Sequence, residues 1–315
     1  MSRIHEALKK AEQERIAAEH VEAPPITADE LLESVSARRA PAVILAPEPS
    51  AAPADPPVAA VNQRITVEWL REKCAKPAWA PDSKTMLFFQ GSNHQRGTEE
   101  FRTLRTRLYK LREKQPLRTI LVTSALHAEG KSFVAANLAQ VISRQHERKA
   151  LLIDGDLRKS RLHVPLGAPH APGLTEYLRG DFDETAVIQQ SPEPNLFFLP
   201  GGAPAPNPAE LLANGRFQKL LEQMAGIFDW VIVDSPPAIP VADASLMARM
   251  VDGVLFVVCA GFTPYDLAQK ACLEFRDKHL LGAVLNRMEH RLGASYYNGY
   301  RYGYGYGPAI PAGKE

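Results

Sequence analysis

The sequence lacks the features that mark secreted, membrane-spanning or disulfide-stabilised proteins. It has no run of about 18 or more apolar residues, which a transmembrane helix would need. The N-terminus carries charged residues where a signal peptide has an apolar stretch. The three cysteines, Cys74, Cys259 and Cys272, form neither a CxxC pair nor a metal-binding spacing. We therefore expect a cytoplasmic protein with reduced thiols, recruited to the inner face of the membrane only through a partner.

The sequence also has almost no net charge and no dinucleotide-binding glycine motif. Its 37 Lys and Arg residues nearly balance 36 Asp and Glu residues, giving a net charge of +1. No overall field favours nucleic acid, and we expect no nucleic-acid partner. No G-x-G-x-x-G follows the first apolar strand, which argues against a nicotinamide-binding Rossmann enzyme.

Composition divides the chain of 315 residues into four segments. Residues 1–20 have apolar residues at helical spacing, and we expect an amphipathic helix there, although so short a helix is marginal in isolation. Residues 21–83 are rich in Ala and Pro and are expected to form a largely disordered linker. Residues 84–290 have the periodic apolar patterns of a folded domain, and we expect residues 291–315 to form a flexible Tyr/Gly-rich tail.

The folded segment alternates short apolar stretches with helical patterns. Strands are predicted at 119–123, 150–153, 196–199, 230–233, 254–258 and 281–285, and helices at 98–113, 133–144, 209–225, 243–250 and 264–277. This alternation predicts an α/β fold with a doubly wound, mainly parallel sheet, which presents ligand sites at the carboxyl ends of its strands.

A candidate phosphate-binding loop follows the first of these strands. A P-loop needs small residues that let backbone N–H groups wrap phosphate, a Lys for the β- and γ-phosphates, and a Ser or Thr for Mg²⁺. Gly130, Lys131 and Ser132 meet these needs between a strand and a helix. An isolated Gly-Lys-Ser is more often a helix start with an exposed lysine, but this context favours phosphate. The predicted nucleotide-binding residues are Ala125, Leu126, His127, Ala128, Glu129, Gly130, Lys131, Ser132 and Phe133.

Three aspartates end two other predicted strands. Asp154 and Asp156 lie two residues apart, so both side chains share one face if the chain stays extended, and such a pair suits Mg²⁺ binding or proton abstraction. Asp234 follows an apolar strand and precedes Ser-Pro-Pro, in the manner of a Walker B acid. Solvated loop acids and a turn aspartate are the alternatives. The spacing alone leaves the roles of Asp154 and Asp156 interchangeable.

The chain ends in a segment of alternating Tyr and Gly. It holds Tyr296, Tyr297, Tyr300, Tyr302, Tyr304 and Tyr306. On its own such a segment is more often a low-complexity stacking patch. With a phosphate-transfer site upstream, we expect these tyrosines to be phosphoacceptors.

These motifs together resemble the cytoplasmic catalytic half of the bacterial tyrosine kinases of polysaccharide export, the BY-kinases. Residues 151–158 fit the family's hhhDxDhR segment, and Glu99, Arg102 and Arg105 fit its oligomerisation motif of one Glu and two Arg. Further similar stretches lie at 173–178, 199–202, 207–212 and 229–237. The resemblance covers about residues 85–306. The N-terminal opening looks like that of autokinases of exosortase-linked exopolysaccharide loci. His127 and Ala128 replace the usual Pro-Gly, and Phe133 replaces a common Thr.

The resemblance implies a P-loop NTPase fold of the deviant Walker, MinD-like type that uses ATP and Mg²⁺. It implies that Lys131 holds the β- and γ-phosphates, that Ser132, Asp156 and Asp234 hold Mg²⁺, and that Asp154 takes the phenol proton. The substrate is then the tail of a neighbouring copy. The implied partners are other copies in a homo-oligomer, for which the family offers a ring octamer, a separate membrane activator that determines polymer chain length, and a cognate tyrosine phosphatase.

Two other functions remain open at this point. A MinD- or ParA-like ATPase switch would share the fold, but those proteins carry a signature Lys where this chain has Leu126. A polysaccharide-assembly scaffold would use its ATP site only for oligomerisation. ATP turnover without phosphotyrosine would favour either of them over a kinase.

Overall fold

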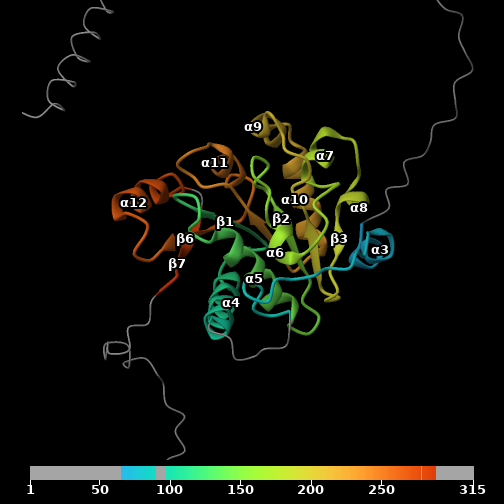
Figure 1. Cartoon of the computed structure of the whole chain (residues 1–315), viewed down its shortest axis with the longest axis horizontal. Coiled ribbons are helices and arrows are strands. Elements are labelled where there is room, and N and C mark those ends of the chain that lie inside the picture. The colour runs from blue at the N-terminus through green and yellow to red at the C-terminus, as the bar shows by residue number, and fades with distance from the viewer. Residues whose placement is uncertain (1–64, 90–96, 278, 289–315) are drawn as a thin grey trace, which may run out of the picture. The chain divides into compact units, whose positions relative to one another are not determined.

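The computed structural model describes residues 65–89, 97–277 and 279–288, which contain one seven-stranded sheet covered by helices (Figure 1). The strand order is β3-β4-β2-β5-β1-β6-β7. Neighbouring strands run parallel except β3 and β4, which are antiparallel. The strands are β1 Thr119–Ser124, β2 Ala150–Asp154, β3 Gln189–Gln190, β4 Leu196–Leu199, β5 Trp230–Asp234, β6 Gly253–Cys259 and β7 Leu280–Asn286.

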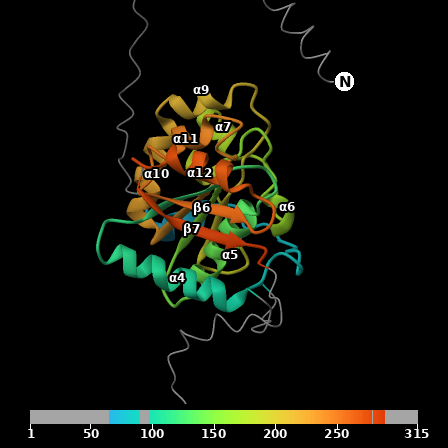
Figure 2. The ribbon, with the colours of Figure 1, turned by 90° about the vertical axis from the view of Figure 1, so that its left-hand side faces the viewer.

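Helices cover both faces of the sheet, and each face has its own apolar core. Because successive side chains of a strand point to opposite faces, Leu121 and Leu151 join one core while Ile120 and Leu152 join the other. Figure 2 shows α4 and α5 on one side of β6 and β7 and α10 to α12 on the other. The helices are α3 Val67–Lys73, α4 Thr98–Arg112, α5 Lys131–Ser143, α6 His163–Leu166, α7 Leu174–Arg179, α8 Glu184–Val187, α9 Pro208–Ala213, α10 Arg216–Ile227, α11 Asp243–Met247 and α12 Tyr265–Leu273.

One predicted helix is wrong. The apolar pattern over 209–225 predicts a single helix, but the chain forms α9 and α10 with a break at Asn214 and Gly215. Gly215 has a φ of 81°, in the left-handed region that a right-handed helix does not contain. The side-chain amide of Asn214 donates to the carbonyl oxygen of Leu178, which fixes the break against α7.

The packed part of the chain also begins before residue 84, inside the segment that its composition assigns to the linker. In α3, Val67 and Leu70 are buried in the core. Thr66 caps this helix, since its side chain accepts a hydrogen bond from the N–H of Trp69. The high Ala and Pro content of residues 21–83 hides this short apolar helix.

Three expectations lie outside the described residues: the helix at 1–20, the part of the linker at 21–64, and the tail with its tyrosines. Among the residues that the structure describes, no helix has both the length and the apolar character needed to cross a membrane.

Candidate active site

The chain segments that carry the candidate site residues meet at one edge of the sheet. β2, β5 and β1 are consecutive in the strand order and run parallel, so their carboxyl ends lie together. β1 leads into the loop 125–130, β2 ends at Asp154 and β5 ends at Asp234. Folding thus brings the P-loop and both aspartates to the same edge, although up to about 110 residues separate them in the sequence.

The loop between β1 and α5 contains two residues with left-handed backbone angles. Ala128 has a φ of 63° and Gly130 a φ of 94°. For Ala128 this conformation costs about 1 kcal/mol, because its Cβ approaches a carbonyl oxygen. Gly130 is the N-cap of α5, which begins at Lys131. The unpaired amide groups at the start of this 13-residue helix suit a phosphate group.

The side chains of the loop differ in where they lie. Ala125 and Glu129 are buried, Leu126, Gly130, Lys131, Ser132 and Phe133 are partly exposed, and His127 and Ala128 are exposed. The ring of Phe133 packs against Phe101 of α4, with centroids 5.8 Å apart. The carboxylate of Glu129 accepts a hydrogen bond from the N–H of Leu126 within the loop. Phe133 and Glu129 therefore use their side chains for packing and loop structure, and only their backbone groups remain for a nucleotide.

Lys131 lies beside Asp156, which follows the end of β2. Its Nζ is 3.7 Å from Oδ2 of Asp156, and the two side chains are 13% and 8% exposed. The other oxygen of Asp156 accepts a hydrogen bond of 3.0 Å from the N–H of Lys159. A lysine and a carboxylate are thus held together at the N-terminus of the P-loop helix, where phosphate and a cation would bind.

Asp154 is fully buried and accepts three hydrogen bonds. Its Oδ2 accepts from the hydroxyl of Ser160 at 2.7 Å and from the N–H of Leu162 at 3.0 Å. Its Oδ1 accepts from the N–H of Asp156 at 3.2 Å. Burial, followed by repulsion from Asp234, raises the pKa of Asp154 to about 7. The side chain organises the loop that follows β2 and titrates near neutral pH.

Asp234 is also buried, and one of its carboxylate oxygens accepts no hydrogen bond from the described residues. Burial raises the pKa of its carboxyl group, while Lys131 and Ser132 act in the opposite direction. Among the described residues, Oδ1 of Asp234 finds no hydrogen-bond partner. A buried carboxylate oxygen without a partner fits a cation ligand.

The described residues contain no cluster of three or more His, Cys, Asp or Glu side chains that could hold a metal by themselves. Mg²⁺ commonly binds one or two carboxylates and completes its shell with water and substrate phosphates. The donor set of Ser132, Asp156 and Asp234 fits Mg²⁺ of this kind, bound together with a nucleotide.

Comparisons with known proteins agree with this geometry. No family model matches the chain. Tyrosine-protein kinase YwqD of Bacillus subtilis strain 168 is 37% identical over 191 residues, which cover 60% of this chain and 80% of YwqD. The putative tyrosine-protein kinase CapB of Staphylococcus aureus is 33% identical over 208 residues, covering 65% of this chain and 90% of CapB. This chain belongs to the bacterial tyrosine kinases, the BY-kinases.

Solved structures support the same family and the P-loop α/β fold. The kinase domain of the Escherichia coli tyrosine kinase ETK is 33% identical, covers 64% of this chain and 80% of its own, and has a TM-score of 0.59. The chimerical protein CapA2B2 is 29% identical, covers 71% of this chain and 99% of its own, and has a TM-score of 0.62. The kinase interpretation is therefore favoured over a MinD- or ParA-like switch.

In this BY-kinase the three residues of the candidate oligomerisation motif lie on α4 but have different surroundings. Arg102 donates to the carboxylate of Glu99 within the same helix, and both side chains have exposed area. Arg105 is partly buried and donates from Nη1 to the carbonyl oxygen of Val141 at 2.8 Å. Val141 is in the last turn of α5, where carbonyl groups lack helical partners. Arg105 thus links α4 to the P-loop helix of the same chain.

Arg158 of the hhhDxDhR segment is also held within the chain. Its Nε and Nη2 donate to the two oxygens of Asp243 at 2.7 and 3.0 Å. The Asp243 side chain is only 1% exposed, so this pair compensates a buried carboxylate at the start of α11. The sequence gives no local sign of this contact, since the partners are 85 residues apart.

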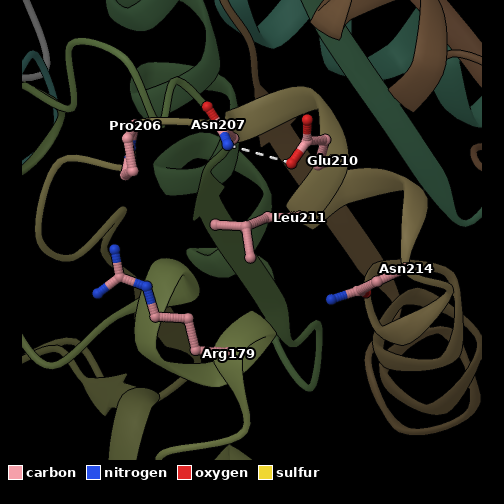
Figure 3. A pocket seen from close by; sticks show the side chains of 6 residues that line it. All are labelled: Arg179, Pro206, Asn207, Glu210, Leu211 and Asn214. Atoms are coloured by element: carbon pink, nitrogen blue, oxygen red, sulfur yellow. Dashed lines mark hydrogen bonds between the residues drawn. The ribbon is translucent and has the colours of Figure 1, made fainter. Parts of the chain in front are cut away.

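A small hollow of about 290 Å³ lies between α7 and α9 of the BY-kinase (Figure 3). Its lining residues are Arg179, Pro206, Asn207, Glu210, Leu211 and Asn214. The side-chain amide of Asn207 donates to Glu210 at 3.1 Å. None of the P-loop residues or the three aspartates lines this hollow, and the opposite charges of Arg179 and Glu210 give it no preference for an anion.

Proposed function

We propose that this BY-kinase transfers the γ-phosphoryl group of ATP to tyrosines of its own C-terminal tail and thereby regulates exopolysaccharide synthesis and export. The observation that carries the proposal is the meeting of Lys131, the Asp154 and Asp156 pair, and Asp234 at the carboxyl ends of three adjacent parallel strands. These residues supply a phosphate-binding cation, carboxylates for a metal and a candidate base at one site.

In the proposed mechanism, Lys131 and the amide groups of residues 126–132 bind the β- and γ-phosphates. Ser132, Asp156 and Asp234 would hold Mg²⁺, which would neutralise negative charge on the phosphate oxygens. Lys131 then exchanges part of its interaction with Asp156 for the phosphates. The unpartnered Oδ1 of Asp234 supports its role as a ligand.

Asp154 is the proposed base for the phenol proton. Its pKa, raised to about 7 by burial, lies near working pH, where a base accepts and releases a proton most effectively. Oδ1 accepts one hydrogen bond, from the N–H of Asp156, and so keeps capacity for the phenol. Because the carboxylate is fully buried, the tyrosine reaches it only when residues that cover it move.

The proposed acceptors are Tyr296, Tyr297, Tyr300, Tyr302, Tyr304 and Tyr306, presented in trans to a neighbouring copy. Each phosphate adds about −1.5 to −2 charges, so a phosphorylated tail is repelled by the acidic site and leaves it. Release of several tails would favour dissociation of the homo-oligomer. Glu99, Arg102 and Arg105 are proposed to stabilise that oligomer, of which a ring octamer is the proposed form.

The remaining partners follow from the family resemblance. We propose a cytoplasmic location, recruitment to the inner face of the membrane by a separate activator that determines polymer chain length, and reversal by a cognate tyrosine phosphatase. No helix of the described residues is long and apolar enough to cross a membrane.

The proposal is tested by intact mass and phosphotyrosine mapping after purified full-length protein is incubated with Mg-ATP. The variants are Lys131→Met, a chain truncated after Gly293, and Lys219→Met as a matched control on the exposed face of α10. We expect phosphate on residues 296–306 in the wild type and the control and none in Lys131→Met. ATP hydrolysis without phosphotyrosine, even with the cytoplasmic tail of a candidate activator added, would replace the kinase with an ATPase switch or scaffold.

A further inference from the structure

The most unusual side chain of the P-loop is Glu129, a fully buried carboxylate in a loop that binds anionic phosphate. It forms no salt bridge among the described residues; hydrogen-bond donors surround it instead. The N–H of Leu126 donates to one oxygen, and the hydroxyl of Thr263 donates to the other. We call the set Leu126, Glu129, Thr263 and Asn286 the Glu129 clasp.

Thr263 is held rigidly by the end of β6. Its hydroxyl accepts a hydrogen bond of 3.0 Å from the N–H of Cys259, and its own N–H donates to the carbonyl oxygen of Cys259 at 3.0 Å. A hydroxyl has one hydrogen to donate, and with the Cys259 amide as its donor, the Thr263 hydrogen is directed to Glu129. The end of β6 thus fixes the position of the Glu129 side chain.

Asn286 forms a second arm of the clasp from the end of β7. Its side-chain amide donates to the backbone carbonyl oxygen of Glu129 at 2.9 Å. The backbone carbonyl oxygen of Asn286 accepts a hydrogen bond from the N–H of Ala260, which ties β7 to the loop after β6. A Cβ at Gly130 would lie 2.0 Å from Nδ2 of Asn286, so this contact also requires glycine at position 130.

The clasp acts on the strained part of the loop. Glu129 lies between Ala128 and Gly130, and both have left-handed φ angles. Ala128 disfavours this conformation, so the loop needs interactions that hold the chain at Glu129. The clasp supplies them at the peptide between Glu129 and Gly130, through Asn286, and at the Glu129 side chain, through Leu126 and Thr263.

We propose that Thr263 and Asn286 are positioning residues that hold the P-loop amides in the phosphate-binding geometry through Glu129. The inference rests on the proposed function in one respect, that this loop binds the nucleotide. Neither residue needs to touch phosphate. Loss of either arm lets the peptide at Ala128 relax, which misaligns the amide donors before the nucleotide binds.

The first test measures the affinity of the full-length protein for Mg-ADP by isothermal titration calorimetry. Thr263→Val keeps the shape but removes the hydroxyl, and we expect roughly 10- to 150-fold weaker binding, the range for one hydrogen bond to a charged group. Thr263→Ser keeps the hydroxyl and should bind within about twofold of wild type. Thr185→Val is the matched control, since its hydroxyl donates to Asp183 on the surface, at 2.7 Å.

A double-mutant cycle separates positioning from a general loss of stability. Glu129→Gln retains one acceptor oxygen and therefore loses one of the two side-chain hydrogen bonds, from Leu126 or from Thr263, while the backbone contact with Asn286 remains. We expect the double variant Glu129→Gln with Thr263→Val to bind Mg-ADP about as weakly as the weaker of the two single variants. The product of the two single-variant losses in affinity is the upper limit. The melting temperature of each variant is measured beside its affinity.

Asn286→Ala tests the other arm if Thr263→Val does not fold. It should weaken Mg-ADP binding and raise the KM for ATP more than it lowers kcat, because the reacting groups stay in place. Variants that melt at lower temperature yet bind Mg-ADP like wild type would overturn the positioning role and leave the proposed function intact. A folded wild type that binds no Mg-ADP would overturn both.

Discussion

Asp154 and Asp234 are direct register partners at the ends of β2 and β5, so two buried carboxyl groups lie side by side on neighbouring strands. The backbone stays paired just beyond this point, since the N–H of Gly155 donates to the backbone carbonyl oxygen of Asp234 at 2.8 Å. Such an arrangement costs stability when both groups are charged. Lys131 offsets part of this cost at Asp234, and the proposed Mg²⁺ would offset more of it.

The first prediction concerns stability and pH. The pKa of Asp154 is raised from 3.8 to about 7. Between about pH 4 and pH 7 the unfolded chain has lost this proton while the folded chain still holds it, so the free energy of unfolding falls as pH rises. Asparagine at position 154 does not titrate, so from pH 5 to pH 8 the free energy of unfolding of Asp154→Asn should rise relative to wild type by on the order of 2 kcal/mol.

Urea unfolding of the nucleotide-free protein at pH 5 and pH 8 measures this difference. The free energy of unfolding of Asp154→Asn minus that of wild type should be higher at pH 8 than at pH 5. Asp252→Asn serves as a control for the loss of an aspartate that lies outside the site. Equal gaps at both pH values would mean that Asp154 is charged throughout and has no role as a base near neutral pH.

The second prediction concerns the P-loop backbone. Because Ala128 has a left-handed φ of 63°, Ala128→Gly should stabilise the protein by up to about 1 kcal/mol and tighten Mg-ADP binding. The matched control is Ala268→Gly inside α12, a partly exposed helical position where the same change should destabilise by about 0.5–1 kcal/mol. Thermal melts of both variants give the sign. Destabilisation by both would show that Ala128 is not strained.

The third prediction concerns Arg158. Removing it leaves the Asp243 carboxylate buried without its bidentate partner, so Arg158→Ala should lower the free energy of unfolding by roughly 2–4 kcal/mol. Arg158→Lys keeps the charge but loses the bidentate geometry, and an intermediate loss is expected. The double variant Arg158→Ala with Asp243→Ala should recover much of the stability. If Arg158→Ala instead kept its stability and lost only kcat, the guanidinium would serve the phosphoryl group.

Much of the sheet can be predicted from the sequence because each inner strand is an uninterrupted apolar run. The pattern at 196–199 coincides with β4, and the one at 150–153 misses only Asp154 of β2. β3 escapes detection because it consists of two residues, Gln189 and Gln190, without an apolar pattern. These two residues form a strand because they pair with β4 and with Ala75, which are contacts that the local sequence does not reveal.

The site residues also differ in whether the sequence alone can identify them. The P-loop and the aspartates each have a local signal, a short motif after an apolar strand. Thr263 and Asn286 have none, because they meet Glu129 across 134 and 157 residues of sequence. Similarly, three-residue spacing places Glu99, Arg102 and Arg105 on one side of a helix, but it cannot tell that Arg105 contacts the P-loop helix of its own chain.

The last prediction separates the two functions of α4. Arg105 donates to an otherwise unpaired carbonyl group of α5, so Arg105→Ala should destabilise the isolated subunit by about 1–2 kcal/mol. Arg102→Ala disrupts an exposed pair with Glu99 and should cost at most about 0.5 kcal/mol. Arg107→Ala, on the exposed face of α4, is the control for loss of an arginine from this helix.

Urea unfolding measures the stability of these variants, and sedimentation velocity measures their oligomeric state. If the motif joins subunits, Arg102→Ala should dissociate the oligomer while leaving the subunit stable, whereas Arg105→Ala should change both. An Arg102→Ala protein that sediments like wild type would remove Arg102 from the interface and leave α4 with only its role inside the subunit.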